Sequence, residues 1–203
     1  MPPKQERSRE TEAAIIRAAI KLVSGKNSDE ITIREICTEA GVSVGAFYHH
    51  FRSRHELYQR FFEGFDQEVS RRIASYHQSK PPLEALTELL LFQTCYAARE
   101  TQGAAHRYLT SILNDPFPPS VDPNRPYYQL AYDCVHRLAA SGRLYPECPP
   151  ERIAELCILF VRGCLVDWCL HEHSYDVVER VRFCLPILYR GFLKEPVLSL
   201  IHI

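Results

Sequence analysis

The sequence GVSVGAFYHHFRSRHEL, residues 41–57, concentrates side chains that could bind a polyanion. Gly45 and Ala46 are small enough to let a helix enter a DNA major groove, while Tyr48 and His49 carry donors for phosphate oxygens or base edges. A Tyr-His-His run is also unsuited to a hydrophobic core. These residue types suit DNA docking if one helix presents them on one face.

Two arginines continue the stretch. Arg52 and Arg54 flank the expected start of a helix, where guanidinium groups and free backbone N–H groups could both hold a phosphate. Ser53 and Glu56 have the spacing of a capping box, which indicates that start. We expect this helix to run to near His77, before the two prolines at 81 and 82.

Two short helices must position these side chains. Thr32 and Glu35 form a capping box, and apolar residues then repeat at helical spacing as far as Ala40. Gly41 favours the left-handed conformation that ends a helix, and Ser43 can cap a further helix from 44 to about 50. The sequence therefore predicts a helix-turn-helix.

An earlier helix, from Thr11 to Val23, is expected to complete this unit. Its apolar residues Ile16, Ala19, Ile20 and Val23 recur at i, i+3, i+4 and i+7. On the third helix, the i, i+4 pair Phe47 and Phe51 should point inward against Ile16, Ile36 and Ala40 and leave the opposite side exposed.

The rest of the chain also has helical periodicity, and the expected fold class is all-α. We expect helices at about 83–100, 103–114, 124–142, 150–172 and 175–194, with the proline-rich segment 115–126 as the main loop.

Composition places the chain among folded globular proteins. Of its 203 residues 46% are hydrophobic and 24% charged, and the formal net charge of −1 argues against indiscriminate coating of nucleic acid. No signal peptide is evident, and the longest apolar stretch, 153–170, is interrupted by charges, which makes a membrane span unexpected. The expected compartment is the cytoplasm.

Eight cysteines are present, at 37, 95, 134, 148, 157, 164, 169 and 184, without any CxxC pair. Buried structural thiols are the favoured interpretation, with a redox switch or metal site as alternatives. Cys169, His171 and His173 supply only two ligands on one helical face, so we expect no metal and no cofactor.

The helix-turn-helix spacing by itself also fits a protein-binding adaptor that uses its aromatic corner. An enzyme is disfavoured, because the sequence lacks Ser-His-Asp spacing, a Gly-rich phosphate loop and a carboxylate-His cluster.

Residues 31–57, ITIREICTEAGVSVGAFYHHFRSRHEL, closely resemble the DNA-binding region of TetR-family transcriptional regulators. Residues 15–19 with 22–23 resemble the first helix of that family, and Gly163, Trp168, Asp176 and the run 188–191 resemble its typical ending. The resemblance implies a homodimer, most often a repressor, that leaves a near-palindromic operator when a small molecule binds. A thiol- or metal-responsive regulator on the same fold is the alternative.

The resemblance also implies residue roles. Thr32 and Arg34 would contact the DNA backbone, Tyr48 and Arg54 would each bind a phosphate, and Ser43 would cap the recognition helix and touch phosphate; Val44, Gly45, Ala46 and His49 would face bases. Val44 and Ala46 replace residues that are commonly polar or hydroxylated in the family, which predicts base reading by van der Waals contact. Arg54 replaces the usual Lys, and His55 a common Glu.

For the larger domain the implied assignments are an effector cavity and a dimer interface. The expected cavity walls are Phe92, Tyr96, Arg99, His106, Tyr108 and Ile112, which favour a mostly apolar effector with one anionic group for Arg99. The last two helices would pair across a two-fold axis through Phe160, Gly163, Cys164, Trp168, Phe183, Ile187 and Arg190.

We accordingly expect a DNA-binding domain at 1–55 and an effector-binding and dimerisation domain at 56–197. The last six residues, 198–203 (LSLIHI), match the translation of a sequencing adapter, and we interpret them as an assembly artefact.

Overall fold

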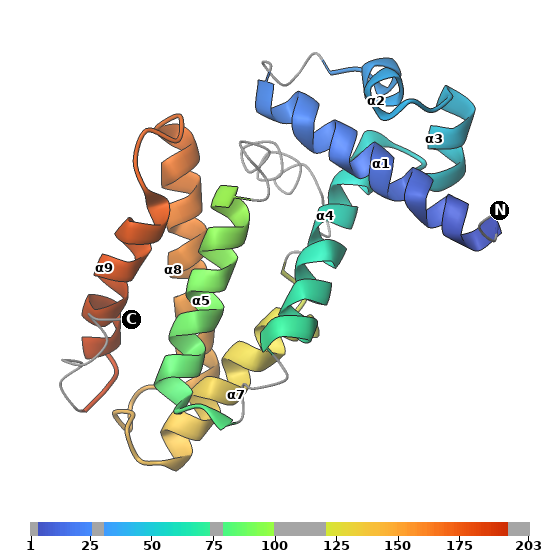
Figure 1. Cartoon of the computed structure of the whole chain (residues 1–203). Helices are drawn as coiled ribbons and strands as arrows, with labels where there is room; N and C mark the ends of the chain where they lie inside the picture. Colours follow the sequence, from blue (N-terminus) through green and yellow to red (C-terminus); the bar gives the residue numbers. More distant parts are fainter. Residues whose placement is uncertain (1–3, 26–30, 74–78, 100–120, 195–203) are drawn as a thin grey trace. The chain divides into compact units, whose positions relative to one another are not determined.

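The computed structural model describes residues 4–25, 31–73, 79–99 and 121–194 (Figure 1). Within these ranges the regular secondary structure is helical, apart from one isolated bridge between Leu144 and Leu193. The all-α prediction is therefore confirmed. The chain divides into two compact units, and the division falls inside α4 (Arg54–Glu68), between Gly64 and Phe65. The expected domain boundary was at residues 55 and 56.

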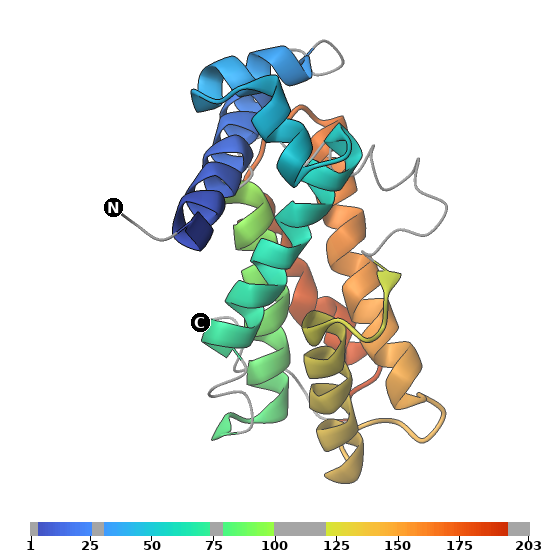
Figure 2. The ribbon, with the colours of Figure 1, turned by 90° about the vertical axis from the view of Figure 1, so that its right-hand side faces the viewer.

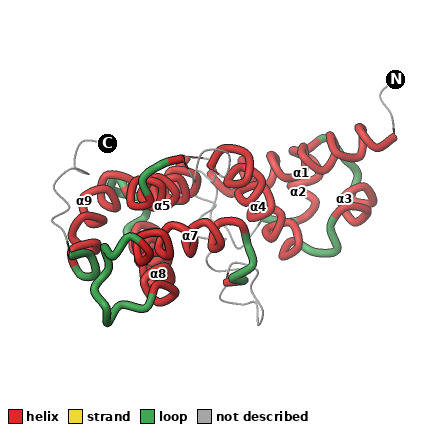
Figure 3. Tube along the Cα trace, turned by 90° about the horizontal axis from the view of Figure 1, so that it is seen from below, coloured by secondary structure: helices red, strands yellow, loops and turns green. Residues whose placement is uncertain are grey.

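The first unit contains α1 (Lys4–Gly25), α2 (Ile33–Ala40), α3 (Val44–His50) and the start of α4 (Figure 3). Both α2 and α3 pack against α1. Its core consists of completely or almost completely buried side chains: Ile15, Ala18, Ala19, Ile31, Ile36, Cys37, Phe47, Phe51 and Leu57.

The buried face of α1 differs from the predicted one by about one residue. Ile15, Ala18 and Ala19 are the buried positions, whereas Ile16 and Ile20 are only partly buried against them. The difference arises because apolar residues occur on both sides of this helix, so periodicity alone allows either face to be inward. The side chain of Val23 lies outside the described residues.

Helix α4 changes geometry near its end. The α-helix stops at Glu68 and continues as one π-helical turn, Val69–Ile73, with Val69 completely buried. A π-helical turn contains an extra residue and often occurs at functional sites. The predicted continuation to His77 lies outside the described residues.

The second unit is built by α5 (Pro82–Arg99), α7 (Pro126–Ala140), α8 (Pro150–Leu170) and α9 (Val177–Arg190) (Figures 1 and 2). Helix α5 packs against α7, α8 and α9, so it forms the centre of this core. These helices agree with the predicted ones to within a few residues at each end. The predicted helix 103–114 and the terminal segment 198–203 lie outside the described residues. No helix in the described ranges is both long and apolar enough to cross a bilayer.

Candidate nucleic-acid interface and effector site

Helix α3 has one buried and one exposed side. Phe47 and Phe51 are completely buried in the first core, and their rings lie 5.5 Å apart. The opposite side exposes Tyr48 to 55% and Val44 to 39%, together with His49. The structure therefore separates inward phenylalanines from an outward surface, as the i, i+4 spacing predicts.

Capping residues define the end of α2 and the start of α3. Ser43 Oγ accepts a hydrogen bond from Ala46 N at 3.1 Å and begins α3. Gly41 ends α2 with φ of 67°, the left-handed conformation that its lack of a Cβ permits. The turn between α2 and α3 thus has the tight geometry of a helix-turn-helix.

The capping box of α2 is present and uses both hydrogen-bonding capacities of Thr32. Its hydroxyl accepts from Glu35 N at 3.2 Å and donates to Glu35 Oε2 at 3.0 Å, while Thr32 N also donates to Glu35 Oε2 at 2.8 Å. The hydroxyl hydrogen is therefore engaged within the protein. The exposed Arg34 side chain lies two residues further along α2.

Arg54 is exposed, and its Nη1 donates to Ile31 O at 2.7 Å. This bond links the first residue of α4 to the residue that precedes Thr32, so the starts of α2 and α4 lie together. The sequence pattern did not reveal this link, because it joins residues 23 positions apart. The expected capping box at the start of α4 is half present: Ser53 Oγ accepts from Glu56 N at 3.1 Å, but the Glu56 carboxylate accepts from Arg52 N at 2.7 Å instead of from Ser53 N. The side chain of His55 lies outside the described residues.

The second unit holds a cluster of aromatic rings between α4, α5 and α7. Phe65 lies at its centre, with ring centroids 5.8 Å from Phe92, 5.2 Å from Tyr96 and 5.4 Å from Tyr127. Two predicted effector residues, Phe92 and Tyr96, are thus brought together. The side chain of Arg99 and residues His106, Tyr108 and Ile112 lie outside the described residues.

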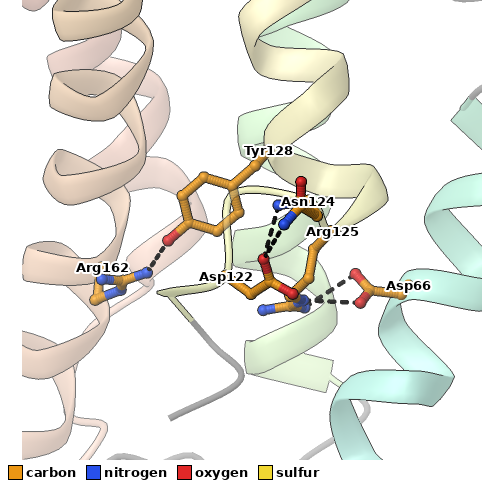
Figure 4. A network of polar contacts seen from close by, with 6 residues as sticks. All are labelled: Asp66, Asp122, Asn124, Arg125, Tyr128 and Arg162. Carbon is orange, nitrogen blue, oxygen red and sulfur yellow. Dashed lines mark hydrogen bonds and ion pairs between the residues drawn. The ribbon is translucent and has the colours of Figure 1, made fainter. Parts of the chain in front are cut away.

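Charged groups adjoin this aromatic cluster (Figure 4). Arg125 makes two hydrogen bonds to Asp66, at 2.8 and 2.9 Å, and its guanidinium lies 6.0 Å from the centroid of the Phe65 ring. Arg162 Nη2 donates to Tyr128 Oη at 2.6 Å. Sequence reasoning missed Arg125, because no local pattern shows that it faces a carboxylate 59 residues earlier.

The last two helices expose a row of apolar side chains. Leu159 on α8 is 57% exposed, and Phe183 and Ile187 on α9 are 72% and 55% exposed. Gly163 is also exposed, and a Cβ added there would have no atom within 4 Å, so this part of α8 is open. Phe160 and Cys164 are partly buried, and Arg190 is exposed.

Trp168 does not belong to this exposed row. Its side chain is 7% exposed, and its indole Nε1 donates to Tyr175 O at 2.9 Å. It therefore stabilises the turn between α8 and α9 inside its own chain, and it is too buried to belong to the dimer surface expected from the sequence.

Comparison with known proteins places this geometry in a family. Residues 15–61 match the family model of the bacterial regulatory proteins, tetR family. The transcriptional regulator AcrR of Shigella flexneri is 31% identical over 96% of this chain and 94% of its own length. The chain belongs to the TetR family of transcriptional regulators.

Two solved structures share the fold of this TetR-family chain at low sequence identity. The repressor NalD of Pseudomonas aeruginosa superposes with a TM-score of 0.64 at 22% identity, covering 94% of this chain and 99% of its own. FadR of Bacillus subtilis, in complex with stearoyl-CoA, has a TM-score of 0.69 at 15% identity, covering 88% of this chain and 98% of its own.

The cysteines of this TetR-family chain are all free. Burial raises the pKa of the Cys134 and Cys157 thiols to about 12 and that of Cys169 to about 11. Thiols with such pKa values remain protonated near neutral pH, and the thiol is a weaker nucleophile than the thiolate. These positions fit structural roles better than redox sensing.

Proposed function

We propose that this TetR-family chain is a homodimeric repressor that a small molecule releases from a near-palindromic operator. The proposal rests on the two opposite sides of α3. Two buried phenylalanines on one side fix the orientation of the exposed surface on the other, which is built from Tyr48, Val44 and His49. A recognition helix needs this arrangement, because its base-reading side chains must be held by a rigid core.

In the proposed complex the phosphate contacts come from three exposed positions. Tyr48 Oη donates to one phosphate, and the Arg54 guanidinium, held by Ile31 O, presents its remaining N–H groups to another. The hydroxyl of Ser43, which accepts from Ala46 N, retains its hydrogen for a third. Arg34 contributes charge at the start of α2. Thr32 acts mainly by capping α2 in this proposal, with its backbone near the DNA.

In the proposed complex, the N-terminal half of α3 and His49 contact the edges of the bases. Val44 and Gly45 are exposed and Ala46 is also on this side of the helix, so this surface is small and largely apolar. Such a surface discriminates bases by contact with thymine methyl groups rather than by paired hydrogen bonds.

The proposed dimer forms through α8 and α9. Leu159, Phe183 and Ile187 would otherwise leave large apolar side chains in water, and pairing two copies about a two-fold axis buries them in a four-helix arrangement. An operator with two related half-sites follows from that symmetry.

The proposed effector binds at the aromatic cluster in the second unit. Phe65 belongs to α4, the helix that continues from the first unit, so an occupant that displaces its ring acts directly on that helix. A ligand regulates only through unequal affinity for two states. The aromatic walls favour an apolar effector, and the stearoyl-CoA bound to FadR supports an acyl ligand as one candidate.

Operator recovery from random DNA tests the proposal, followed by binding measurements on the recovered sequence. Tyr48→Phe should weaken binding by about tenfold or more, because a hydrogen bond to a charged phosphate is lost. The matched control is Tyr145→Phe, which removes the hydroxyl of another exposed tyrosine, in the second unit.

Fluorescence anisotropy at two salt concentrations gives the affinity and the number of phosphates bound. The logarithm of the association constant falls by roughly 0.9 per phosphate contact for each tenfold increase in salt. Failure to recover any sequence, or equal binding by wild type and Tyr48→Phe, would contradict the proposed interface and favour the adaptor alternative. Loss of operator binding after alanine replaces Phe183 and Ile187, with retained helicity, tests the dimer surface.

A further inference from the structure

Gly163 lies inside α8, at a position where neither the backbone nor the packing of its own chain requires glycine. The helix is regular there, so alanine could adopt the same conformation. Among the described residues, a Cβ added at Gly163 would meet no atom within 4 Å. Glycine inside a helix also lowers helix stability relative to alanine. A group from outside the chain that packs against the helix backbone would account for this residue.

Large apolar side chains flank Gly163 on the same face of α8. Leu156, Leu159, Val166 and Leu170 recur at spacings of three and four residues and are 42%, 57%, 39% and 73% exposed. Gly163 occupies the middle of this row with the same spacing. The row therefore has a gap one side chain wide, between Leu159 and Val166, where the helix backbone is accessible. We call this gap the notch.

Phe183 is an exposed ring on the neighbouring helix α9. Its side chain is 72% exposed, and that of Ile187, one turn further, is 55% exposed. Helices α8 and α9 follow each other in the chain and pack side by side (Figure 1). Gly163 is seven residues before the end of α8 and Phe183 is six residues after the start of α9, so both lie about 10 Å along their helices from the connecting turn. The ring and the notch are therefore at the same level.

The residues next to the ring and the notch confirm that this part of α8 is close to this part of α9. Burial, and after it the proximity of Cys184, raises the pKa of the Cys164 thiol. Cys164 follows Gly163 in the chain and Cys184 follows Phe183. One continuous surface thus contains both a protruding ring and a gap that exposes backbone.

Such a surface fits a second copy of itself. In a two-fold interface the same patch of both copies meets, so the patch must be complementary to itself. A two-fold axis that passes between α8 and α9 at the level of Gly163 places each ring over the notch of the other copy. A different protein would need only one of the two features.

The apolar area is also sufficient for a dimer. Six side chains on the two helices are between 39% and 73% exposed: Leu156, Leu159, Val166, Leu170, Phe183 and Ile187. At roughly 50 Å² each, they would bury roughly 300 Å² per copy. This is more than half of the apolar part of a standard interface, which buries about 800 Å² per partner.

We propose that Phe183 of a second copy packs into the notch at Gly163, and that this reciprocal contact determines which chains can pair. The inference rests on the proposed dimer and adds the contact that selects the partner. A related chain with a large side chain at the position of Gly163 is excluded, because that side chain occupies the space that the ring needs.

Gly163→Leu tests the contact, because the two possibilities predict changes of opposite sign. If nothing enters the notch, leucine completes the apolar row and favours the helix, so dimerisation should become tighter. If the ring of Phe183 fills the notch, leucine overpacks the interface and should raise the dimer dissociation constant about tenfold or more. Analytical ultracentrifugation of the full chain over a dilution series measures this constant, and circular dichroism checks that helicity is retained.

A second substitution should rescue the first. Adding Phe183→Ala to Gly163→Leu places a small residue opposite the new leucine, so the double variant should dimerise about fivefold more tightly than Gly163→Leu alone. The control is Ala140→Leu, which adds a leucine at an exposed position at the end of α7 and should leave the constant unchanged.

The outcomes separate this inference from the proposed dimer. Equal or tighter dimerisation of Gly163→Leu, or a double variant that is no tighter than Gly163→Leu, overturns the contact while the dimer itself stands. A wild-type chain that remains monomeric throughout the dilution series overturns the proposed dimer, and the contact with it.

Discussion

The ion pair between Asp66 and Arg125 should contribute measurably to stability, and Asp66→Asn tests this. Asp66 lies in the part of α4 that belongs to the second unit, and Arg125 precedes α7. Asparagine is similar in size and keeps one carbonyl oxygen, so the change removes the charge and one of two hydrogen bonds (Figure 4).

The expected magnitude follows from burial. The side chains of Arg125 and Asp66 are only 11% and 19% exposed, so water screens the pair poorly. Removing one partner of a fully buried pair costs about 3–5 kcal/mol, because the remaining charge loses its compensation. Since this pair retains some exposure, we expect a loss of about 2–3 kcal/mol, which corresponds to a decrease in Tm of roughly 4–12 °C.

Chemical denaturation and calorimetry at one protein concentration provide the assay, because the proposed dimerisation would make Tm depend on concentration. The control is Glu68→Gln in the same helix. Glu68 pairs with Arg71 at 3.0 Å, but these side chains are 30% and 66% exposed, so the loss should stay below about 1 kcal/mol. Equal losses for the two variants would refute the reasoning from burial, as would purely additive effects when Asp66→Asn is combined with Arg125→Gln.

Three further predictions concern local structure and pH. Thr32→Ala should destabilise the first unit by about 1 kcal/mol in denaturant unfolding, because the cap at Glu35 N is lost; an unchanged midpoint would contradict the capping box. Gly41→Ala should cost about 1–2 kcal/mol from the left-handed φ alone, since no atom lies within 4 Å of the added Cβ, and a stabilised variant would exclude that conformation. Burial raises the pKa of Cys134 and Cys157 from 9.0 to about 12, so the folded chain keeps protons that the unfolded chain releases. The free energy of unfolding should therefore fall as pH rises from about 9 toward 12, by up to about 1.4 kcal/mol per thiol per pH unit, and Cys→Ser at both positions should flatten that part of the profile.

Helix boundaries and caps were predictable because they depend on neighbouring residues. Thr32 with Glu35, Gly41 and Ser43 each act within a few positions, and the structure shows the expected geometry at each. The buried face of α1 was less predictable. Apolar residues lie on two sides of that helix, and only the shape of the facing α2 and α3 selects Ile15 over Ile16 as the inward position.

In the larger unit, too, local features were predictable from the sequence and the packing between distant residues was not. Its helices could be located from periodicity, but the meeting of Phe65 with Phe92 and Tyr96 depends on how helices pack. Trp168 was expected at the dimer surface because of its place in a typical family ending, whereas its indole bond to Tyr175 O places it inside.

The sequence by itself determined the all-α class, the helix-turn-helix and the family, because these depend on short-range periodicity, caps and a contiguous motif. Only the tertiary structure decided which distant groups accept hydrogen bonds from the arginine side chains. Arg54 reaches Ile31 across 23 positions and Arg125 reaches Asp66 across 59. Such pairs arise from chain packing, and no local pattern records which distant residue the packing will bring within hydrogen-bond distance.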